Sequence, residues 1–434
     1  MPADAPRVAL RTLGCKVNRA ESESLAEHLR SLGVVVGDDP GPDDTVVVNT
    51  CTVTAEADAK ARKEVRRALG ATRGVVVVTG CLAVLEADML RSLGERVVVV
   101  ADRESLRTTV AGIVCARTVA LGPGEAAAPP VVARRASGTF RTRALVKVQD
   151  GCDNRCAYCI VPDARGVPRS VAAADIVRRV DALRASGTAE VVLTGVNLGR
   201  YGDGDAARDL AALIELLAGT GIARIRLSSI EPPDLSERLL AVLARTRSVA
   251  PHLHVPLQSG SDRILSAMRR RYDTREYAGA LSHARDAIPG LAVTTDVIAG
   301  FPGESDADAA ESLAFVAGCG FAKLHVFRYS KRAGTPAASA EQVAAPLRNG
   351  RARALRELGT SLERAYATAR AGQRTDLLVE AVRDGVAHGT TGDHLRVSME
   401  SGDARPGDLV PIELALEDDG SLRGYYVGEM RARV

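Results

Sequence analysis

The chain has 434 residues, of which 46% are hydrophobic and 26% charged, and its formal net charge is +3. This length accommodates two or three domains, and the composition excludes wholesale disorder and a collagen-like fibre. The balance of 57 basic against 54 acidic residues excludes a uniformly basic nucleic-acid coat but not a local basic face, and the 3% aromatic content disfavours binding through many stacking platforms.

The N-terminal part is predicted to alternate strands with helices. Short, nearly continuous apolar runs indicate strands buried on both faces, as in a parallel sheet covered by helices. We therefore expect an open parallel α/β sheet domain over residues 1–121, followed by a Gly/Pro/Ala-rich linker at 122–137. The expected strands are Val8–Leu13, Thr45–Asn49, Val75–Thr79 and Val97–Val100, and the expected helices are Glu21–Leu32, Ala55–Leu69, Val84–Leu93 and Glu104–Cys115.

A second series of strands and helices is expected over residues 138–371. Six βα units favour a partial TIM-like (β/α)6 barrel over a closed eight-unit barrel, and a doubly wound sheet is the alternative. Either architecture places functional residues at the C-terminal ends of strands. The expected strands are Ala144–Gln149, Val191–Thr194, Ile225–Ser229, Leu253–Leu257, Ala292–Ile298 and Lys323–Arg328, and the helices include Ala172–Ala185, Ala206–Ala218, Asp234–Ala244, Asp306–Ala317 and a basic helix, Arg351–Ala371.

The last segment, 372–434, follows a different pattern. Apolar and polar residues alternate on a short period between Gly and Asp turns, which is typical of a small antiparallel β-barrel. Residues 375–434 hold six Arg against twelve acidic residues, so this barrel cannot contact RNA through bulk positive charge. Tyr425, Tyr426 and selected arginines would have to act through stacking and shape.

The chain has eight cysteines, no apolar signal core at its start and no apolar run of about 18 residues that could span a bilayer. We therefore expect a cytoplasmic protein without membrane contact, in which thiols stay reduced. Cysteines in such a chain indicate metal or redox chemistry rather than disulfides. Cys115 and Cys319 have no partner at ligand spacing and are interpreted as structural.

Three cysteines, Cys152, Cys156 and Cys159, follow the first strand of the second series with the spacing C-x3-C-x2-C. Three thiolates on one loop can hold three corners of a cubane iron–sulfur cluster, whose ligation usually takes four cysteines. One iron would then stay open to the amino and carboxylate groups of S-adenosylmethionine. The alternative is packing or structural zinc, but zinc normally needs a fourth nearby Cys or His, and none follows Cys159 closely.

Cys15, Cys51 and Cys81 each lie just after a predicted parallel strand of the N-terminal domain. The ends of such strands share one edge of the sheet, so these three cysteines would meet there and could hold a second cluster. Three buried apolar cysteines are the alternative. No G-x-G-x-x-G follows the first strand, which disfavours ordinary dinucleotide binding, and no Gly-Lys pair exists for a Walker A loop.

Turn-rich strand ends in the second series offer further candidate ligand contacts. Gly195 and Asn197 follow the second strand, while Asp296 and Gly300 mark the fifth. Glycine lets the backbone approach a ligand, and Asn or Asp can hydrogen-bond its amino or hydroxyl groups. His252 and His254 share one face of a strand, which also admits a metal hydrolase with Asp296 as a further ligand; filling the barrel interior is the alternative.

Two segments, 134–147 and 328–374, are locally basic. The second holds ten Arg or Lys against three Glu. Both are candidates for phosphate contacts, with solvated helix surface as the alternative. Arg351, Arg353 and Arg356 in the second segment are predicted to bind RNA.

Motifs over nearly the whole chain resemble the radical S-adenosylmethionine methylthiotransferase family. The three cysteines of the 152–159 loop, with Tyr158, resemble its C-x3-C-x-aromatic-C motif. LGCKVNRAES, NTCTVT and TGCLA resemble its N-terminal domain, RLSSIEP, HVPLQSGSDRILSAMRRRY and DVIAGFPGE its barrel, and the last sixty or so residues its TRAM domain. GCKVN and NTCTVT are similar to the branch that modifies threonylcarbamoyladenosine in tRNA.

The resemblance implies an enzyme that inserts a methylthio group at C2 of N6-threonylcarbamoyladenosine at tRNA position 37. It implies two [4Fe–4S] clusters. Cys152, Cys156 and Cys159 would hold the cluster that cleaves S-adenosylmethionine to a 5′-deoxyadenosyl radical. Cys15, Cys51 and Cys81 would hold an auxiliary cluster that presents sulfur, and a second S-adenosylmethionine would supply the methyl group. The candidate S-adenosylmethionine contacts are Tyr158, Gly195, Asn197, Asp296 and Gly300.

The expected partners are tRNA and a flavodoxin- or ferredoxin-like electron donor, while the sulfur donor is not identified by the sequence. Two other functions stay open. The same two clusters could methylthiolate a ribosomal-protein side chain, or the chain could be a non-catalytic iron–sulfur or zinc protein that binds RNA. The acidic terminal barrel departs from a simple RNA clamp.

Overall fold

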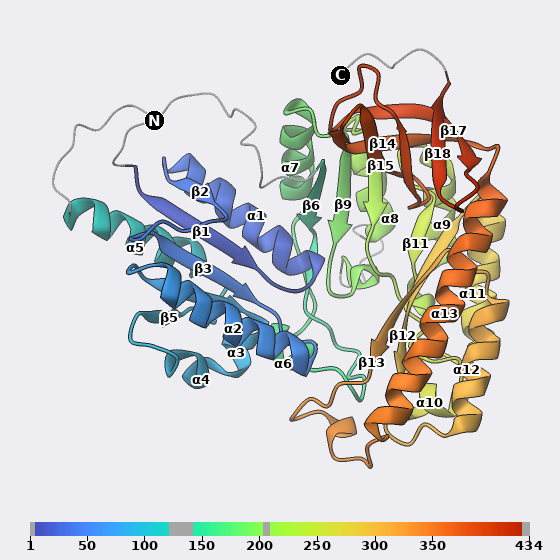
Figure 1. The fold of residues 1–434 in the computed structure, drawn as a ribbon, viewed down its shortest axis with the longest axis horizontal. Coiled ribbons are helices and arrows are strands. Elements are labelled where there is room, and N and C mark those ends of the chain that lie inside the picture. The colour runs from blue at the N-terminus through green and yellow to red at the C-terminus, as the bar shows by residue number, and fades with distance from the viewer. Residues whose placement is uncertain (1–4, 121–141, 203–208, 428–434) are drawn as a thin grey trace. The chain divides into compact units, whose positions relative to one another are not determined.

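The structure is a computed structural model that describes residues 5–120, 142–202 and 209–427 (Figure 1). The chain divides into two compact units. Unit 1 comprises Met1–Phe140 and Cys159–Gly166, and unit 2 comprises Arg141–Tyr158 and Val167–Val434. The linker expected at 122–137 lies outside the described residues, and the domain boundaries expected from the sequence stay predictions.

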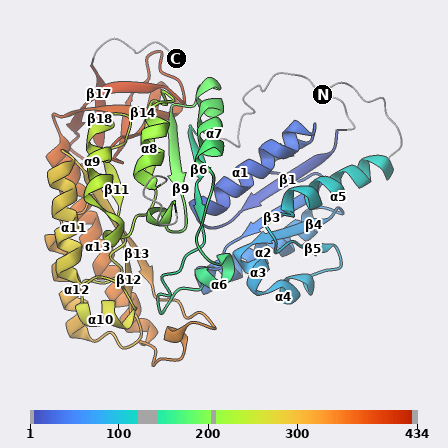
Figure 2. The ribbon, with the colours of Figure 1, turned by 180° about the vertical axis from the view of Figure 1, so that it is seen from behind.

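Unit 1 is built on a five-stranded parallel sheet in the order β2-β1-β3-β4-β5. Its central strands are valine-rich and fully buried because helices cover both faces (Figure 2). α1 and α5 pack on one face, and α2, α3 and α4 pack on the other. The elements are β1 (Arg7–Thr12), α1 (Lys16–Ser31), β2 (Val35–Gly37), β3 (Thr45–Thr50), α2 (Ala55–Ala71), β4 (Val76–Gly80), α3 (Cys81–Leu85), α4 (Ala87–Arg91), β5 (Val97–Val99), α5 (Leu106–Ala120) and α6 (Val161–Arg165).

The expected open parallel α/β sheet is confirmed, with local differences, among them that α5 runs to Ala120 and not to Cys115. The three-residue edge strand β2 was not expected. α1 begins at Lys16 rather than Glu21, so that Cys15 is its N-cap residue. The helix expected at Val84–Leu93 is instead two short helices, because Glu86 between them leaves the helical conformation, with φ −133° and ψ 41°.

Unit 2 contains six parallel strands that follow one another in chain order. β10-β9-β6 and β11-β12-β13 form two three-stranded sheets, and a parallel bridge from Ser229 to His254 joins them. This order has no reversal, so the partial barrel is confirmed and the doubly wound alternative is wrong. The elements are β6 (Arg143–Lys147), β7 (Gln149–Asp150), β8 (Arg169–Ser170), α7 (Ala173–Ala185), β9 (Glu190–Thr194), α8 (Leu210–Ala218), β10 (Arg224–Leu227), α9 (Glu237–Arg245), β11 (His252–His254), α10 (Asp262–Ala267), α11 (Thr274–Ala287), β12 (Ala292–Ala299), α12 (Asp306–Gly318), β13 (Lys323–Arg328) and α13 (Ala345–Arg370).

Several boundaries in unit 2 differ from the expectation. β11 ends two residues before Pro256, which cannot donate to a strand ladder, although the strand was expected to reach Leu257. α8 begins at Leu210 because the Asp209 side chain accepts a hydrogen bond from the Ala212 N–H and caps it. α13 begins at Ala345, before the expected Arg351, and packs along β13 and β12 (Figure 1).

The C-terminal strands of unit 2 close into a barrel in the order β14-β15-β16-β18-β17, as expected. The strands are β14 (Arg374–Arg383), β15 (Val386–Thr391), β16 (Arg396–Glu400), β17 (Leu409–Leu416) and β18 (Leu422–Tyr426).

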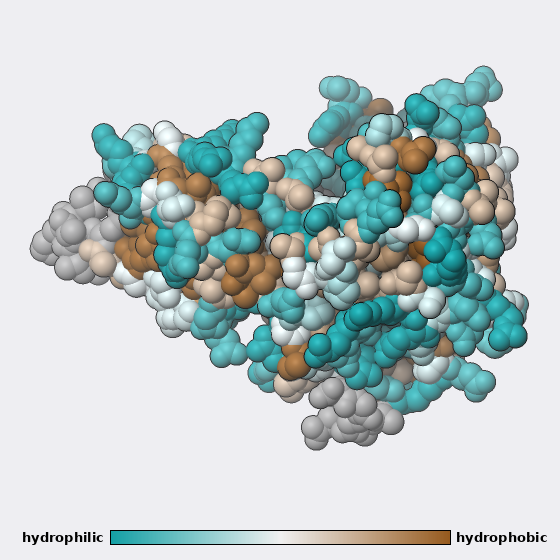
Figure 3. All heavy atoms as spheres, turned by 90° about the horizontal axis from the view of Figure 1, so that it is seen from below, coloured by the Kyte–Doolittle hydropathy of each residue, from teal (hydrophilic) through white to brown (hydrophobic). Residues whose placement is uncertain are grey.

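Hydrophilic side chains predominate on the face of unit 2 that Figure 3 shows. Over the described ranges, every helix is too short or too polar to cross a bilayer.

Candidate functional site

The strand ends of unit 1 bring one cysteine triad together. Cys15, Cys51 and Cys81 follow β1, β3 and β4, which are adjacent in the sheet. Gly14 and Gly80 precede two of these cysteines with φ of +99° and +93°. A Cβ would lie 2.5 Å from the Cys51 Cβ at the first position and 2.3 Å from a backbone oxygen at the second, so only glycine allows the strand ends to approach this closely.

The three thiols of this triad are free and share one electrostatic neighbourhood. Burial raises the pKa of Cys51 to about 11, with smaller contributions in the same direction from Cys15 and Cys81 and an opposing one from the Val53 N–H. Burial also raises the pKa of Cys81, against the opposing positive charges of Arg165 and Arg103. Cys51 and Cys81 therefore favour the thiolate form only when a cation or metal compensates its charge.

In the part of the chain that the structure describes, no three His, Cys, Asp or Glu side chains are arranged to hold a metal ion. The fit to a cluster rests on donor chemistry. Cys15, Cys51 and Cys81 present three reduced thiols without a carboxylate or imidazole among them, and arginines lie beside one sulfur. Thiolates are the usual ligands of iron–sulfur clusters, so this donor set fits such a group.

The second cysteine triad lies on the loop after β6 and β7. Cys152 and Cys156 belong to unit 2, whereas Cys159 belongs to the segment counted with unit 1. Gln149 Nε2 donates to the carbonyl oxygens of Asp150 and Gly151 at 2.9 and 2.8 Å, which holds the start of the loop. The Ala157 N–H donates to the Met268 carbonyl at 2.9 Å, so the loop is anchored within unit 2 before any ligand binds.

Cys156 lies beside a buried ion pair that the sequence interpretation missed. Arg270 Nη1 is 3.1 Å from Cys156 Sγ and 3.3 Å from the Tyr158 hydroxyl oxygen. The same guanidinium pairs with Glu231, and its Nε donates to the Tyr272 hydroxyl at 3.0 Å. The Arg270 guanidinium therefore lies within hydrogen-bonding distance of the Cys156 sulfur. Both members of the pair lie in the quoted barrel motifs, but spacing alone gave no sign that they would meet.

Asn197, one of the candidate S-adenosylmethionine contacts, has a buried side chain. The residue is 3% exposed, and its N–H donates to Gln149 Oε1 at 2.9 Å. Both polar atoms of its side chain, Nδ2 and Oδ1, lack a hydrogen-bond partner among the described residues. Burying an amide without hydrogen-bond partners costs free energy of folding. This side chain therefore fits a polar ligand that would bond it at the C-terminal end of β9. At Gly195 a Cβ would lie 2.9 Å from the Gln149 side chain, which excludes a larger residue.

Asp296 and Gly300 make protein contacts of their own. Asp296 Oδ1 is 3.2 Å from His254 Nε2, within β12 and β11. Gly300 has φ +73°, and a Cβ there would lie 2.5 Å from the Arg348 side chain, so the glycine makes room for α13. Their contacts with S-adenosylmethionine, like that of Tyr158, stay predictions.

The histidines considered for a metal hydrolase have other partners. His252 Nε2 and His254 Nδ1 lie 3.1 and 2.9 Å from the Thr294 hydroxyl oxygen. His252 also stacks on His394, with ring centroids 4.7 Å apart. These buried contacts agree with the alternative reading, in which both side chains fill the barrel interior.

The three arginines predicted to bind RNA have different surroundings on α13. Arg351 donates to Glu304 Oε2 at 2.9 Å and to Asp306 Oδ1 at 2.7 Å, and its side chain is only 12% exposed. Arg353 and Arg356 are exposed. The exposed pair is therefore better placed to meet an external phosphate, and RNA contact stays a prediction for all three.

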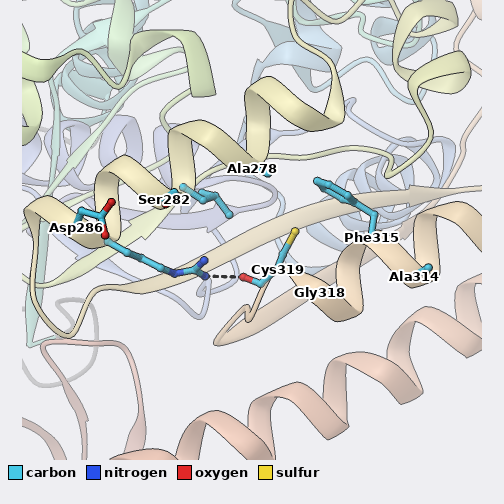
Figure 4. A pocket seen from close by; sticks show the side chains of 9 residues that line it. Ala278, Ser282, Asp286, Ala314, Phe315, Gly318 and Cys319 are labelled. Carbon is cyan, nitrogen blue, oxygen red and sulfur yellow. Dashed lines mark hydrogen bonds between the residues drawn. The ribbon is translucent and has the colours of Figure 1, made fainter.

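Cys319 lines a pocket of about 510 Å³ between α11 and α12 (Figure 4). Burial raises its pKa to about 11, so the thiol stays protonated near neutral pH. Arg285 Nη2 donates to its carbonyl oxygen at 2.6 Å. Cys115 is exposed on α5. Among the described residues, neither cysteine belongs to a group of side chains that could hold a metal ion.

Comparisons with known proteins cover nearly the whole chain. The "Radical SAM superfamily" profile matches residues 146–316, and "Uncharacterized protein family UPF0004" matches residues 7–102. The chain is 36% identical to the threonylcarbamoyladenosine tRNA methylthiotransferase MtaB of Bacillus subtilis (strain 168), over 94% of this chain and 93% of that protein. It is also 36% identical to the tRNA-2-methylthio-N(6)-dimethylallyladenosine synthase of Acidothermus cellulolyticus, over 94% and 86% of the two chains.

Among solved structures, the fold is similar to the radical S-adenosylmethionine methyltransferase TsrM of Kitasatospora setae, with a TM-score of 0.56 at 15% identity. The match covers 88% of this chain and 77% of that chain, so it supports the fold of both units. With its relatives aligned over nearly its whole length, the chain belongs to the radical S-adenosylmethionine methylthiotransferase family.

Proposed function

We propose that the protein methylthiolates C2 of N6-threonylcarbamoyladenosine at position 37 of tRNA. The observation that carries this proposal is the triad of Cys15, Cys51 and Cys81 at three adjacent strand ends of unit 1, in addition to the C-x3-C-x2-C loop. Two relatives named for threonylcarbamoyladenosine, from Bacillus subtilis and Thermotoga maritima, are each 36% identical to this chain. The motifs GCKVN and NTCTVT lie around Cys15 and Cys51 and favour the same substrate.

The family uses S-adenosylmethionine and [4Fe–4S] clusters, including a second cluster in methylthiotransferases. When bound, these cofactors supply the radical, the sulfur and the methyl group, which no side chain can provide. In our proposal Cys152, Cys156 and Cys159 hold one cluster, and Cys15, Cys51 and Cys81 hold the other.

Other residues position these groups. Asn197 would hydrogen-bond polar atoms of S-adenosylmethionine through its unpaired amide. Arg270 orients Cys156 and Tyr158, and Glu231 compensates its charge. A flavodoxin- or ferredoxin-like protein is the proposed electron donor.

The substrate can be tested by mass spectrometry of tRNA nucleosides from a deletion strain of the source organism. We expect 2-methylthio-N6-threonylcarbamoyladenosine to disappear, leaving the unmodified N6-threonylcarbamoyladenosine. The wild-type gene should restore it, whereas the variant with Cys15, Cys51 and Cys81 all replaced by Ala should not. If the methylthio nucleoside persists and no other enzyme in the strain makes it, the proposal is wrong.

N6-dimethylallyladenosine is the second candidate substrate, because a relative named for it is also 36% identical to this chain. The same nucleoside digest separates the two, since each methylthio product has its own mass. Loss of only the dimethylallyl product would assign the chain to that substrate. Unchanged tRNA together with a mass change of a ribosomal protein would favour the protein-modifying alternative, and no change in either would favour a non-catalytic role.

A further inference from the structure

Arg165 is a buried arginine at the end of α6, on the segment that also carries Cys159. The residue is 3% exposed. Its Nε donates to Cys81 Sγ at 3.2 Å, its Nη1 pairs with Glu21 Oε1 at 3.0 Å, and its Nη2 donates to Asn18 Oδ1. All of these residues belong to unit 1.

The partners of Arg165 are themselves held in place. Asn18 Nδ2 donates to the carbonyl oxygens of Leu13 and Thr50, each at 2.9 Å, and so sits between the ends of β1 and β3. Arg103 adds a second cation, with its Nη2 3.8 Å from Cys81 Sγ and its Nε 3.6 Å from Glu21 Oε1. The guanidinium on the Cys81 sulfur is therefore fixed by its surroundings.

A fixed cation on a ligating sulfur has an electronic consequence. Reduction adds negative charge to an iron–sulfur cluster. Its reduction potential therefore depends on the charges near the cluster and on the hydrogen bonds that its sulfurs accept. Glu21 and Asn18 would suffice to hold a purely structural arginine. The additional contact with Cys81 Sγ is what a structural role does not require.

We infer that Arg165 is a positioning residue that raises the reduction potential of the auxiliary cluster through its hydrogen bond to Cys81, with Glu21 opposing it. This inference rests on the proposed ligand set of Cys15, Cys51 and Cys81. It assigns to Arg165 a role that cluster ligation alone does not require.

The test uses the full chain with Cys152, Cys156 and Cys159 replaced by Ala, so that only the auxiliary cluster remains. Iron and sulfide content and the midpoint potential, followed by electron paramagnetic resonance, are measured after anaerobic reconstitution. Arg165→Gln should shift the potential to more negative values, because a positive charge and a donor are lost. Glu21→Gln should shift it to less negative values, because a negative charge is lost. Arg73→Gln is the control, since that exposed arginine pairs with Asp43 and should leave the potential unchanged.

Opposite shifts in the two variants distinguish charge on the cluster from a loss of packing, which would move both variants in the same direction. Arg165→Lys keeps the charge and should shift the potential less than Arg165→Gln does. If Arg165→Gln does not fold, a rise in Glu21→Gln supports the inference and an unchanged value overturns it. Unchanged potentials in iron-loaded variants overturn the inference alone, whereas a parent that binds no iron overturns the proposed ligand set and the inference with it.

Discussion

Asn197 is buried, and both polar atoms of its side-chain amide are unpaired among the described residues. Its own N–H is bonded to Gln149 Oε1, so the backbone at this position is fixed while the amide is left for another group. Desolvating an amide without a partner costs about 1–3 kcal/mol. The position is thus destabilising in the free protein unless a ligand meets the amide.

We expect Asn197→Ala to weaken S-adenosylmethionine binding about tenfold, which corresponds to roughly 1.4 kcal/mol of lost hydrogen bonding. The free protein should be at least as stable as wild type, because an unsatisfied amide is removed. Isothermal titration calorimetry on cluster-loaded protein and urea unfolding of the free protein measure the two effects. Asn349→Ala, at an exposed amide that accepts from Arg328, is the matched control. Equal dissociation constants for wild type and Asn197→Ala would remove Asn197 from the site.

At the scale of the element, α13 shows how a basic helix divides its arginines between two roles. Ala352, Leu355 and Gly359 are buried at helical spacing, and a Cβ at Gly359 would lie 3.2 Å from Leu324 on β13. Arg353 and Arg356 lie on the exposed face of the helix. The segment's local positive charge is therefore only partly available to an external phosphate.

Replacing Arg353 and Arg356 together with Gln should weaken tRNA binding without unfolding the helix. The logarithm of the affinity falls linearly with the logarithm of the salt concentration, and each lost phosphate contact makes this slope shallower by somewhat under one. Loss of both arginines should therefore make the slope shallower by roughly 1.5. Filter binding at several salt concentrations measures this slope. Arg275→Gln, at an exposed position of α11, should leave it unchanged. An unaltered affinity and slope in the double variant would take α13 out of the RNA interface.

At the scale of the whole molecule, unit 2 joins its two barrels through a buried ionic cluster. Arg226 is 1% exposed, and its Nε donates to Glu190 Oε1 at 2.8 Å. Its Nη1 and Nη2 donate to the carbonyl oxygens of Gly392 and Thr391 at 2.8 and 3.0 Å, at the end of β15. Arg224 likewise donates to a carbonyl of β14, so the strands β9 and β10 hold the terminal barrel through these arginines.

Arg226→Met should destabilise the protein by about 3 kcal/mol, because it leaves Glu190 buried without its main partner. Burial raises the pKa of Glu190, but Arg226 and Arg224 outweigh this and hold the pKa below its usual 4.5. The stabilisation is therefore present above pH 4.5 and is lost as the pH falls through the lowered pKa of the folded state. Urea unfolding should show the wild-type advantage shrinking below about pH 4.5.

Arg374→Met serves as the matched control for Arg226→Met. Arg374 forms an exposed pair with Glu413 at 3.5 Å, so its loss should cost less than about 1 kcal/mol. A cost for Arg226→Met as small as that of the control, at every pH, would contradict the role of the buried cluster.

The sequence by itself determined the features that depend on local order. Valine runs predicted the parallel strands, alternation predicted the closed terminal barrel, and spacing placed Cys152, Cys156 and Cys159 on one loop, because each of these patterns spans a few neighbouring residues. The prediction that Cys15, Cys51 and Cys81 meet came instead from the rule that the ends of parallel strands share one edge of a sheet. The sequence did not show that Glu86 divides a helix, nor how far β11 extends.

Only the tertiary structure decided which charged residues are buried and what they contact. Arg165 lies far along the chain from Cys81, as Arg270 does from Cys156, so no spacing rule connects them. Arg351 looks like a phosphate ligand by composition, yet Glu304 and Asp306 hold it. The reason is physical: an arginine's role depends on its burial and on which distant acid or thiol shares its site, and both are set by packing rather than by neighbouring sequence.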